Sequence, residues 1–344
     1  MEPLRAIPGL LKQANLTRLR RELKNRGTAT RAQLAEATGI SATTVRALLE
    51  ELLADGEIER AGCGASSGGR RAGRYRLAPG RYYGAAVCIT GGEAHALVVD
   101  MCGAIVETMP LAVTDGDFVK LLTPFLDEVT ARRQIRVIGV GVPGAADGGG
   151  FWRGEANGAL RRVPLGEELA RRYGVPVVLE NDINATAIGF GRCYEAEFPA
   201  EDPEDTNMAY VYFQQTCVSA GLLAGGRVIR GRNCFAGELG LVPHGAGTVD
   251  EWLAAAADAH TYTARVVEML SWLCGLLNPQ YIALGGPAFR RECLGPIGDG
   301  LTALLPGPLA PELLDAGDPW HDYHSGMAFL TAERMFSEVR LVRR

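Results

Sequence analysis

The most constraining feature of the sequence is a segment near the N-terminus in which one glycine separates two helical patterns. Thr30 can cap a helix over residues 31–38, Gly39 breaks that helix, and Ser41 can cap a second one over residues 42–55. Apolar residues placed to hold the two helices together are Ala35, Ile40, Val45 and Leu48. The pattern is typical of a helix-turn-helix, whose second helix projects into the major groove of DNA.

The start of the second helix is where a helix-turn-helix reaches phosphates and base edges. The candidate DNA-contacting residues of this element are Arg31, Ser41, Thr43, Thr44 and Arg46. A plain helical hairpin is the alternative interpretation of the same pattern.

Two short strand patterns follow, over residues 57–61 and 74–77, with a glycine-rich and basic loop between them. A strand, a basic loop and a strand in this place are the expected wing of a winged helix-turn-helix. Gly69, Arg70 and Arg71 are candidate contacts, because glycine lets the backbone enter a narrow groove and arginine suits its negative potential. A flexible interdomain linker with solvated charges is the alternative.

Charge is unevenly spread along the 344 residues. Residues 1–80 hold 14 Lys and Arg against 8 Asp and Glu, a balance of +6, so the net charge of −5 leaves −11 for the remainder. A basic head on an acidic body favours a polyanionic partner for the head, although a solvated face would explain so modest an excess equally well. We expect a DNA-binding domain over residues 1–80 and a second unit over residues 81–344.

Location in the cell is inferred from what the sequence lacks. It shows no run of about 18 apolar residues and no secretory signal. Its eight cysteines are scattered and form no C-x-x-C pair. These observations predict a cytoplasmic protein with reduced thiols that does not span a membrane.

The remainder of the chain alternates strand and helix patterns, which indicates an α/β fold. A continuous apolar strand over residues 137–142 ends in Pro-Gly, a second buried strand covers residues 175–179, and residues 184–195 read as a helix. Residues 249–277 are predicted to be largely helical. No internal repeat is evident.

Five motifs of this body carry a resemblance when taken together. They are Gly-Val-Gly-Val-Pro-Gly at residues 139–144, Leu-Glu-Asn-Asp-Ile-Asn-Ala at 179–185, Ala-Gly-Glu-Leu-Gly at 236–240, Leu-Asn-Pro at 277–279 and Leu-Gly-Gly at 284–286. With the Gly-Gly-Arg-Arg stretch at 68–71, they resemble the ROK family of repressors and sugar kinases, from about residue 12 onward. The resemblance implies a two-lobed actin/hexokinase-like body with a sugar cleft behind the winged helix-turn-helix.

The phosphate-binding loops depart from the family pattern. Where the family has an Asp before a glycine-rich run, this sequence has Cys88, with Glu93 further on. Where the family has Gly-Thr-Gly-x-Gly, side chains replace the three glycines in residues 215–219, which opposes close approach of a nucleotide. We expect no enzymatic activity and no cofactor. Asp182 stands where the kinases place the general base, and a hydrogen-bonded turn residue is its other interpretation.

The zinc pattern of the family is also absent. Leu241 replaces the histidine that follows Gly-Glu-x-Gly, and no cysteine lies between Cys234 and Cys274. Zinc needs several converging nitrogen and sulfur ligands, so we expect no metal site. The spacing of His321 and His324 is interpreted as incidental.

Sugar ligands follow from the resemblance alone. They map to Asn157, Asn181, Asp182, Glu238 and Glu251. Such side chains bind hydroxyls through paired hydrogen bonds, and the loss of a polar partner at Leu241 would weaken or change the choice of ligand.

The leading hypothesis is a ROK family transcriptional regulator, acting as a repressor on double-stranded operator DNA. It would be a homodimer or a dimer of dimers, with a sugar or sugar derivative as effector. A sugar kinase with an added DNA-binding head and a ligand-blind dimeric regulator are the alternatives.

Overall fold

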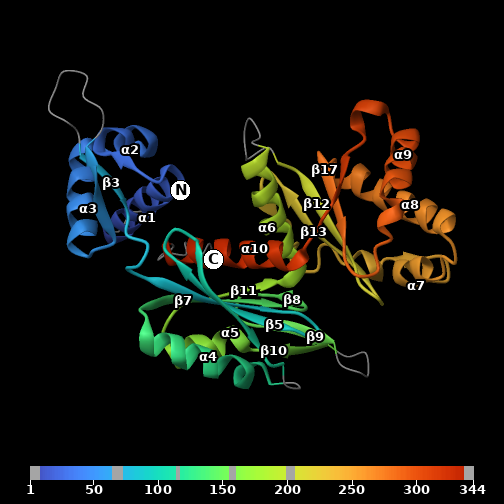
Figure 1. The fold of residues 1–344 in the computed structure, drawn as a ribbon, viewed down its shortest axis with the longest axis horizontal. Helices are drawn as coiled ribbons and strands as arrows, with labels where there is room; N and C mark the ends of the chain where they lie inside the picture. The colour runs from blue at the N-terminus through green and yellow to red at the C-terminus, as the bar shows by residue number, and fades with distance from the viewer. Residues whose placement is uncertain (1–7, 64–72, 114–116, 155–159, 199–205, 337–344) are drawn as a thin grey trace, which may run out of the picture.

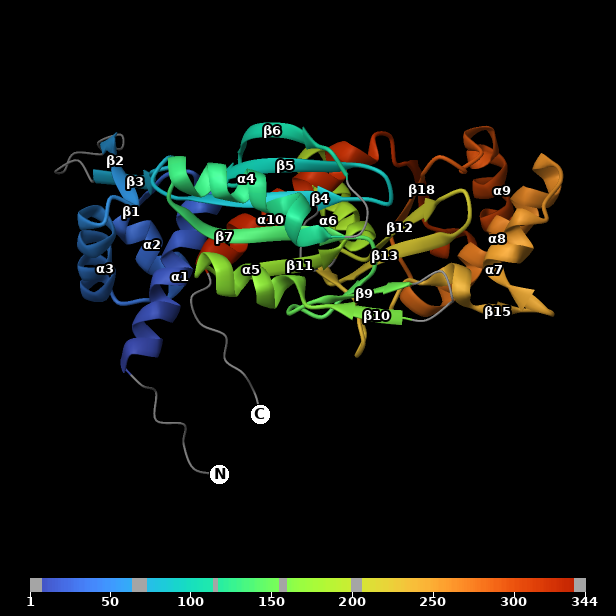
Figure 2. The same ribbon diagram turned by 90° about the horizontal axis from the view of Figure 1, so that it is seen from below.

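The computed structural model describes residues 8–63, 73–113, 117–154, 160–198 and 206–336. Along the chain these residues build a small N-terminal unit and two larger lobes, each with its own sheet (Figure 1). Seen from below, the three lie in a row, with the N-terminal unit at one end (Figure 2). No helix of the described part is long and apolar enough to cross a membrane.

The N-terminal unit has three helices and a three-stranded sheet in the order β1-β3-β2. Its elements are α1 (Pro8–Arg26), β1 (Ala29–Thr30), α2 (Arg31–Thr38), α3 (Ala42–Ala54), β2 (Ile58–Cys63) and β3 (Gly73–Leu77). These bounds confirm the predicted order of two short helices, a tight turn and two strands.

Local chemistry explains why α2 and α3 begin and end where they do. Thr30 and Gln33 form a capping box, in which each side chain accepts a hydrogen bond from the other residue's backbone N–H. Gly39 ends α2 with φ of +67°, a left-handed conformation that glycine adopts without a Cβ clash. Ser41 then caps α3 by accepting from the N–H of Thr44 at 3.2 Å.

The first lobe is a mixed sheet in the order β11-β7-β4-β5-β6. Its strands are β4 (Tyr83–Ile89), β5 (Ala94–Asp100), β6 (Ile105–Leu111), β7 (Ile135–Val142) and β11 (Val177–Asn181). Helices α4 (Phe118–Arg132) and α5 (Leu165–Tyr173) cover one face, and the C-terminal helix α10 (Pro319–Phe336) covers the other. A small sheet of β8 (Ala145–Ala146), β9 (Phe151–Gly154) and β10 (Leu160–Val163) extends this lobe.

The second lobe has the sheet order β14-β13-β12-β17-β18. Its strands are β12 (Met208–Phe213), β13 (Val218–Ala224), β14 (Arg227–Val228), β17 (Tyr281–Gly285) and β18 (Glu312–Asp315). Helix α6 (Asp182–Glu197) packs on one face, while α7 (Val249–Ala254), α8 (Ala259–Leu277) and α9 (Leu294–Leu304) lie on the other. The remaining short elements are η2 (Leu239–Leu241), β15 (Pro243–His244), β16 (Gly247–Thr248), η3 (Arg291–Cys293) and η4 (Gly307–Leu309).

The prediction that residues 249–277 are largely helical is confirmed, with one interruption. Helix α7 ends at Ala254, and α8 begins only at Ala259. Asp258 starts the new helix, because its side chain accepts a hydrogen bond from the N–H of Thr261 at 2.8 Å.

The two lobes repeat one topology. In each sheet the first three strands of the lobe form an antiparallel meander, and two later strands are added in parallel beside the first. Along the chain, a long helix follows the last strand of each sheet, α6 after β11 and α10 after β18. The sequence shows no repeat, so the duplication is visible in the structure alone.

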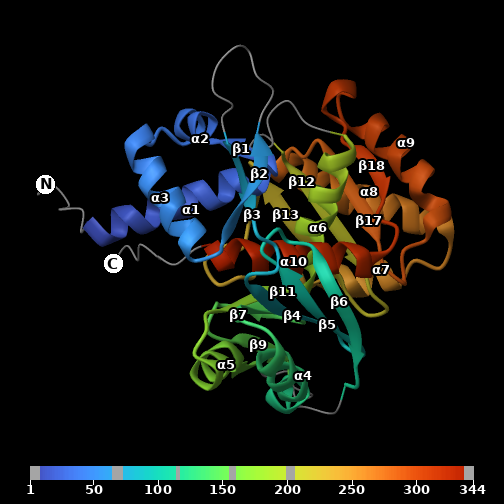
Figure 3. The ribbon, with the colours of Figure 1, turned by 60° about the vertical axis from the view of Figure 1, so that its left-hand side comes forward.

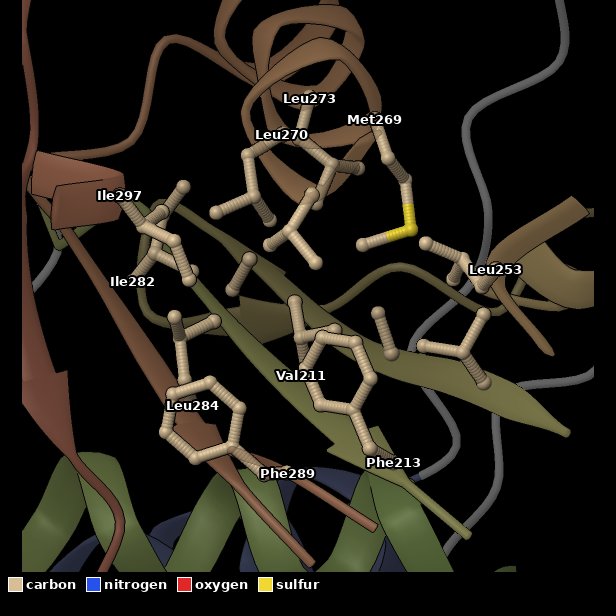
Figure 4. Close-up of a cluster of buried hydrophobic side chains, with 14 of the residues drawn as sticks. Val211, Phe213, Leu253, Met269, Leu270, Leu273, Ile282, Leu284, Phe289 and Ile297 are labelled. Atoms are coloured by element: carbon tan, nitrogen blue, oxygen red, sulfur yellow. The ribbon is translucent and has the colours of Figure 1, made fainter. Parts of the chain in front are cut away.

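The largest apolar cluster of the second lobe lies between its sheet and α8 and α9 (Figure 4). Val211, Ile282 and Leu284 project from the strands, and Leu270 and Leu273 meet them from α8. All five side chains are buried, so burial of their apolar area stabilises the packing of α8 and α9 on this face of the sheet.

Helices α6 and α10 cross at two glycines. A Cβ on Gly189 of α6 would lie 1.8 Å from the carbonyl oxygen of Asp322 of α10. A Cβ on Gly326 of α10 would lie 1.8 Å from the carbonyl oxygen of Ala185 of α6. The helices therefore meet backbone to backbone, which only glycine at both positions permits.

The C-terminal end of α10 belongs to the core of the N-terminal unit. Phe336 is 1% exposed and packs in the same cluster as the leucines of α1 and α3. The hydroxyl of Thr17 donates to the carbonyl oxygen of Phe336 at 2.8 Å, and the ammonium of Lys24 lies 3.2 Å from the carboxylate of Glu333. Figure 3 shows α10 running along the first sheet toward α1. The N-terminal unit, which the sequence predicted to end near residue 80, thus includes the C-terminal end of α10 in its core.

We expect Gly326→Ala to lower the free energy of unfolding by about 3 kcal/mol or more, because its methyl group would overlap the Ala185 carbonyl. The matched control is Gly275→Ala on α8, where a Cβ meets nothing within 4 Å. That control should gain about 0.4–1 kcal/mol from the reduced entropy of the unfolded chain. Urea unfolding of both variants measures the difference, and equal stabilities would contradict the close crossing.

Candidate functional site

The predicted DNA-contacting residues of α2 and α3 lie on one exposed face. Arg31, Ser41, Thr43, Thr44 and Arg46 are exposed, whereas Val45 and Leu48 on the other side of α3 are buried. Two of the five also have structural roles. Ser41 caps α3, and Arg46 pairs with Glu50 one turn later at 2.9 Å.

The tip of the predicted wing lies outside the described residues. Gly69, Arg70 and Arg71 fall in the segment 64–72, of which nothing is described. The strands on either side, β2 and β3, pair antiparallel from Ile58 with Leu77 onward. The two strands of the predicted wing are therefore present, and the role of the basic residues between them stays a prediction.

A cavity of about 450 Å³ lies where the two lobes meet. Six segments line it: the turn between β4 and β5, Pro143 after β7, the start of α6, the end of β12 with the residues after it, Pro287 after β17, and the start of α10. Its lining includes Thr90, Glu93, Asp182, Thr186, Tyr212, Gln214, Gln215, Thr216, Trp320 and Tyr323. Both candidate phosphate loops of the sequence analysis contribute to it, next to Asp182.

Asp182 is the buried carboxyl group of this cavity. Its Oδ1 accepts hydrogen bonds from the N–H of Ile183 at 2.9 Å and from the side-chain amide of Asn181 at 3.0 Å. Burial, reinforced by the negative charge of Glu238, raises the pKa of Asp182 to about 7. A carboxyl group at this pKa exchanges its proton near neutral pH.

Asn181 positions the start of α6. Its side-chain oxygen accepts from the N–H of Asn184 at 2.9 Å, and its amide donates to the carbonyl oxygen of Gly144 at 3.3 Å. These bonds join the start of α6 to the turn after β7. Asn181 therefore fixes the position of Asp182, the next residue of the chain.

Glu238 and Asp250 are neighbouring acidic residues outside the lining of this cavity, and the charge of Glu238 acts on Asp182. Burial and the charge of Asp250 raise the pKa of Glu238, and burial raises that of Asp250. Asp250 also accepts from the N–H of Val218 at 2.8 Å. The sequence analysis did not name Asp250, Gln214, Trp320 or Tyr323, because no single motif contains them.

Of the predicted sugar ligands, Asp182 is the one found among the described residues that line this cavity, and Asn181 directly precedes it in the chain. Glu251 is exposed, and its carboxylate accepts from the N–H of Thr248 at 3.0 Å in a capping box. Asn157 lies in the segment 155–159, outside the described residues. The structure therefore favours Asp250 over Glu251 as the neighbour of Glu238.

The charge of the cavity opposes phosphate. Its charged lining residues among those described are Glu93 and Asp182, both acidic. Arg230, which follows β14 in the chain, is already paired with the buried carboxylate of Glu180. A polyphosphate would meet repulsion in this cavity rather than compensating positive charge.

The region of the family's zinc site carries an exposed aliphatic side chain. Leu241, in η2, is 54% exposed. Within the described parts of the chain, one group of potential metal ligands converges, on α6 and α10.

We expect Asp182→Asn to change how stability depends on pH. The folded chain binds the Asp182 proton with a pKa of about 7, above the ordinary value of 3.8. Asp182 therefore contributes stability below about pH 4 that is lost as the pH rises to about 7. Unfolding curves in urea should show the wild type losing about 1–4 kcal/mol relative to Asp182→Asn across this range. Parallel pH profiles of the two proteins would argue against a buried, protonated carboxyl group.

Comparisons with known proteins agree with this architecture. The model of the ROK family matches residues 85–251, and the model "Winged helix-turn-helix DNA-binding" matches residues 20–59. The xylose repressor of Bacillus subtilis is 27% identical over 239 residues, which cover 67% of this chain and 60% of that repressor. The chain thus matches less than two thirds of this relative's length.

Solved structures show the same fold. A ROK family transcriptional regulator described as a homolog of the E. coli MLC protein superposes with a TM-score of 0.69 at 17% identity. The alignment covers 94% of this chain and 99% of that one. The ROK hexokinase of Thermus thermophilus gives a TM-score of 0.55 at 19% identity, over 72% of this chain and 99% of the hexokinase. The chain therefore joins a winged helix-turn-helix to a two-lobed hexokinase-like body that carries a ROK family domain.

Proposed function

We propose that this chain is a sugar-responsive transcriptional repressor and not a sugar kinase. The observation that carries the proposal is α10, a single helix that lines the cavity between the lobes and ends in the core of the DNA-binding unit. The naming of a similar protein as a xylose repressor supports the same assignment.

DNA binding is assigned to the exposed face of α2 and α3 and to the wing. The proposed contacts are Arg31, Ser41, Thr43, Thr44, Arg46, Gly69, Arg70 and Arg71. Hydroxyl and guanidinium groups at the start of a recognition helix reach both phosphates and base edges, which supports this choice.

The active species is proposed to be a homodimer, alone or as a dimer of dimers. Two copies related by a twofold axis would place two recognition helices about 34 Å apart, in successive major grooves. Such an arrangement reads an inverted repeat in double-stranded DNA.

The effector is proposed to be an uncharged sugar. Asn181, Asp182 and Glu238, with Asn157, would accept and donate hydrogen bonds to its hydroxyl groups. Aromatic rings at Tyr212, Trp320 and Tyr323 line the same cavity, and apolar walls with a few polar groups are usual in small-molecule sites. The acidic lining disfavours a phosphorylated sugar.

The kinase alternative is opposed by the loops that would hold the nucleotide. Glu93 lines the cavity at the first loop, and Gln214, Gln215 and Thr216 line it at the second. Asp182 stands at the position of the kinase general base, but a general base without a bound phosphoryl donor cannot complete phosphoryl transfer.

We expect Arg46→Ala to weaken binding to the preferred duplex by about 5- to 150-fold, corresponding to the loss of one base contact of 1–3 kcal/mol. The preferred sequence is obtained by selection from a randomised duplex pool, and affinity is measured by mobility shift. The control is Arg172→Ala, which removes another exposed, ion-paired arginine from the body. An unchanged affinity in Arg46→Ala would remove Arg46 from the interface.

We expect an uncharged pentose, hexose or acetylated amino sugar to raise the melting temperature and to release the DNA. Asp182→Asn should keep its DNA affinity but bind the sugar about 10-fold more weakly or worse, since the hydrogen bonds of the carboxyl group to the sugar are lost. Glu251→Gln should respond like the wild type, because glutamine preserves the capping box. If no sugar of the panel alters stability or DNA binding, the ligand-blind regulator is the better description.

A further inference from the structure

The crossing of α6 and α10 brings together three side chains of different chemistry. Cys193 lies one turn after Gly189 on α6. His321 and Asp322 lie one turn before Ser325 and Gly326 on α10. Because the backbones touch at the two glycines, side chains one turn away on facing sides converge.

The distances suit a tetrahedral metal ion. Sγ of Cys193 lies 3.7 Å from Nε2 of His321. Zinc bonds of about 2.3 Å to sulfur and about 2.0–2.1 Å to nitrogen at a tetrahedral angle place these two atoms about 3.6 Å apart. A carboxylate oxygen of Asp322 lies within 4.8 Å of both other ligand atoms, so closure around an ion needs a movement of about 1 Å.

Asp322 gives an independent reason to expect a ligand. The residue is 5% exposed, and its Oδ2 is buried without a hydrogen-bond partner among the described residues. A buried carboxylate oxygen left without a partner is costly, and a bound cation would satisfy it.

The surroundings leave room for a fourth ligand. Cys193, His321 and Ser325 line a cavity of about 390 Å³, and the Ser325 hydroxyl lies 3.5 Å from the Cys193 sulfur. His324 lines the same cavity, but its Nε2 is already 2.8 Å from Nδ1 of His95. A water molecule or the serine hydroxyl could therefore complete the site.

We propose that Cys193, His321 and Asp322 bind a divalent transition-metal ion, with Zn²⁺ the best match. A thiolate, an imidazole and a carboxylate are a donor set that Zn²⁺ accepts, whereas Mg²⁺ and Ca²⁺ prefer oxygen ligands alone. This site is separate from the position of Leu241 in the second lobe. The ligands come from α6 and α10, so a bound ion would link the two helices and restrict the movement of α10 relative to α6.

The test is a Co²⁺ titration of the reduced, full-length chain, followed by displacement with Zn²⁺. Co²⁺ bound through Cys193 should give a thiolate-to-cobalt charge-transfer band that saturates at one ion per chain. Cys193→Ser should abolish the band, and His321→Gln should weaken Co²⁺ binding more than about 100-fold, since loss of even an outer partner costs 10- to 100-fold.

Cys102→Ser is the matched control. Cys102 lines the same cavity and is more exposed than Cys193, but it is not among the converging ligands. The control should keep the band and the affinity. His321 is exposed, so its variant should fold normally, which circular dichroism verifies. A titration without a charge-transfer band, or a band that survives Cys193→Ser and is lost in Cys102→Ser, would overturn the proposal.

Discussion

The backbone contact between α6 and α10 is the constraint on which the body depends. Gly189 is the eighth residue of α6 and Gly326 the eighth of α10, and each faces the carbonyl oxygen of the fourth residue of the other helix. The contact is therefore nearly symmetric, as the repeated topology of the two lobes requires. A side chain at either glycine would separate the helices and with them the lobes. The first turns of both helices line the cavity between the lobes, so the crossing fixes the distance between two of its walls.

Sequence reasoning succeeded where the determinants are local. The capping residues Thr30 and Ser41 and the left-handed Gly39 each act within a few residues, so the helix-turn-helix could be read directly. The duplication of the lobes could not be predicted from the sequence, because the two lobes share their strand order and not their residues. The grouping of Cys193 with His321 was equally hidden, since 128 residues separate them and only the helix crossing joins them.

Two adjacent acidic residues of α7 have different hydrogen-bond partners in the structure. Successive helical residues point about 100° apart, so neighbouring carboxylates on α7 have different surroundings. Asp250 faces the strand β13 and accepts from Val218, whereas Glu251 turns back to cap its own helix through Thr248. The family resemblance carried the position Glu251, and only the orientation of α7 favours Asp250. Residues 157 and 69–71 could not be placed in the same way, because they lie outside the described segments.

Helix α10 gives the body a physical route to the DNA-binding unit. Its first turn lines the cavity through Trp320 and Tyr323, and its last turn is held in the head by Glu333 and Phe336. Its 18 residues span about 27 Å, at 1.5 Å per residue. A packed helix moves as one body, so a sugar that shifts the first turn also shifts the last. Such coupling requires the sugar to bind two arrangements of α10 with different affinity. The close glycine crossing favours discrete arrangements over gradual sliding, because touching backbones leave little room between one packing and the next.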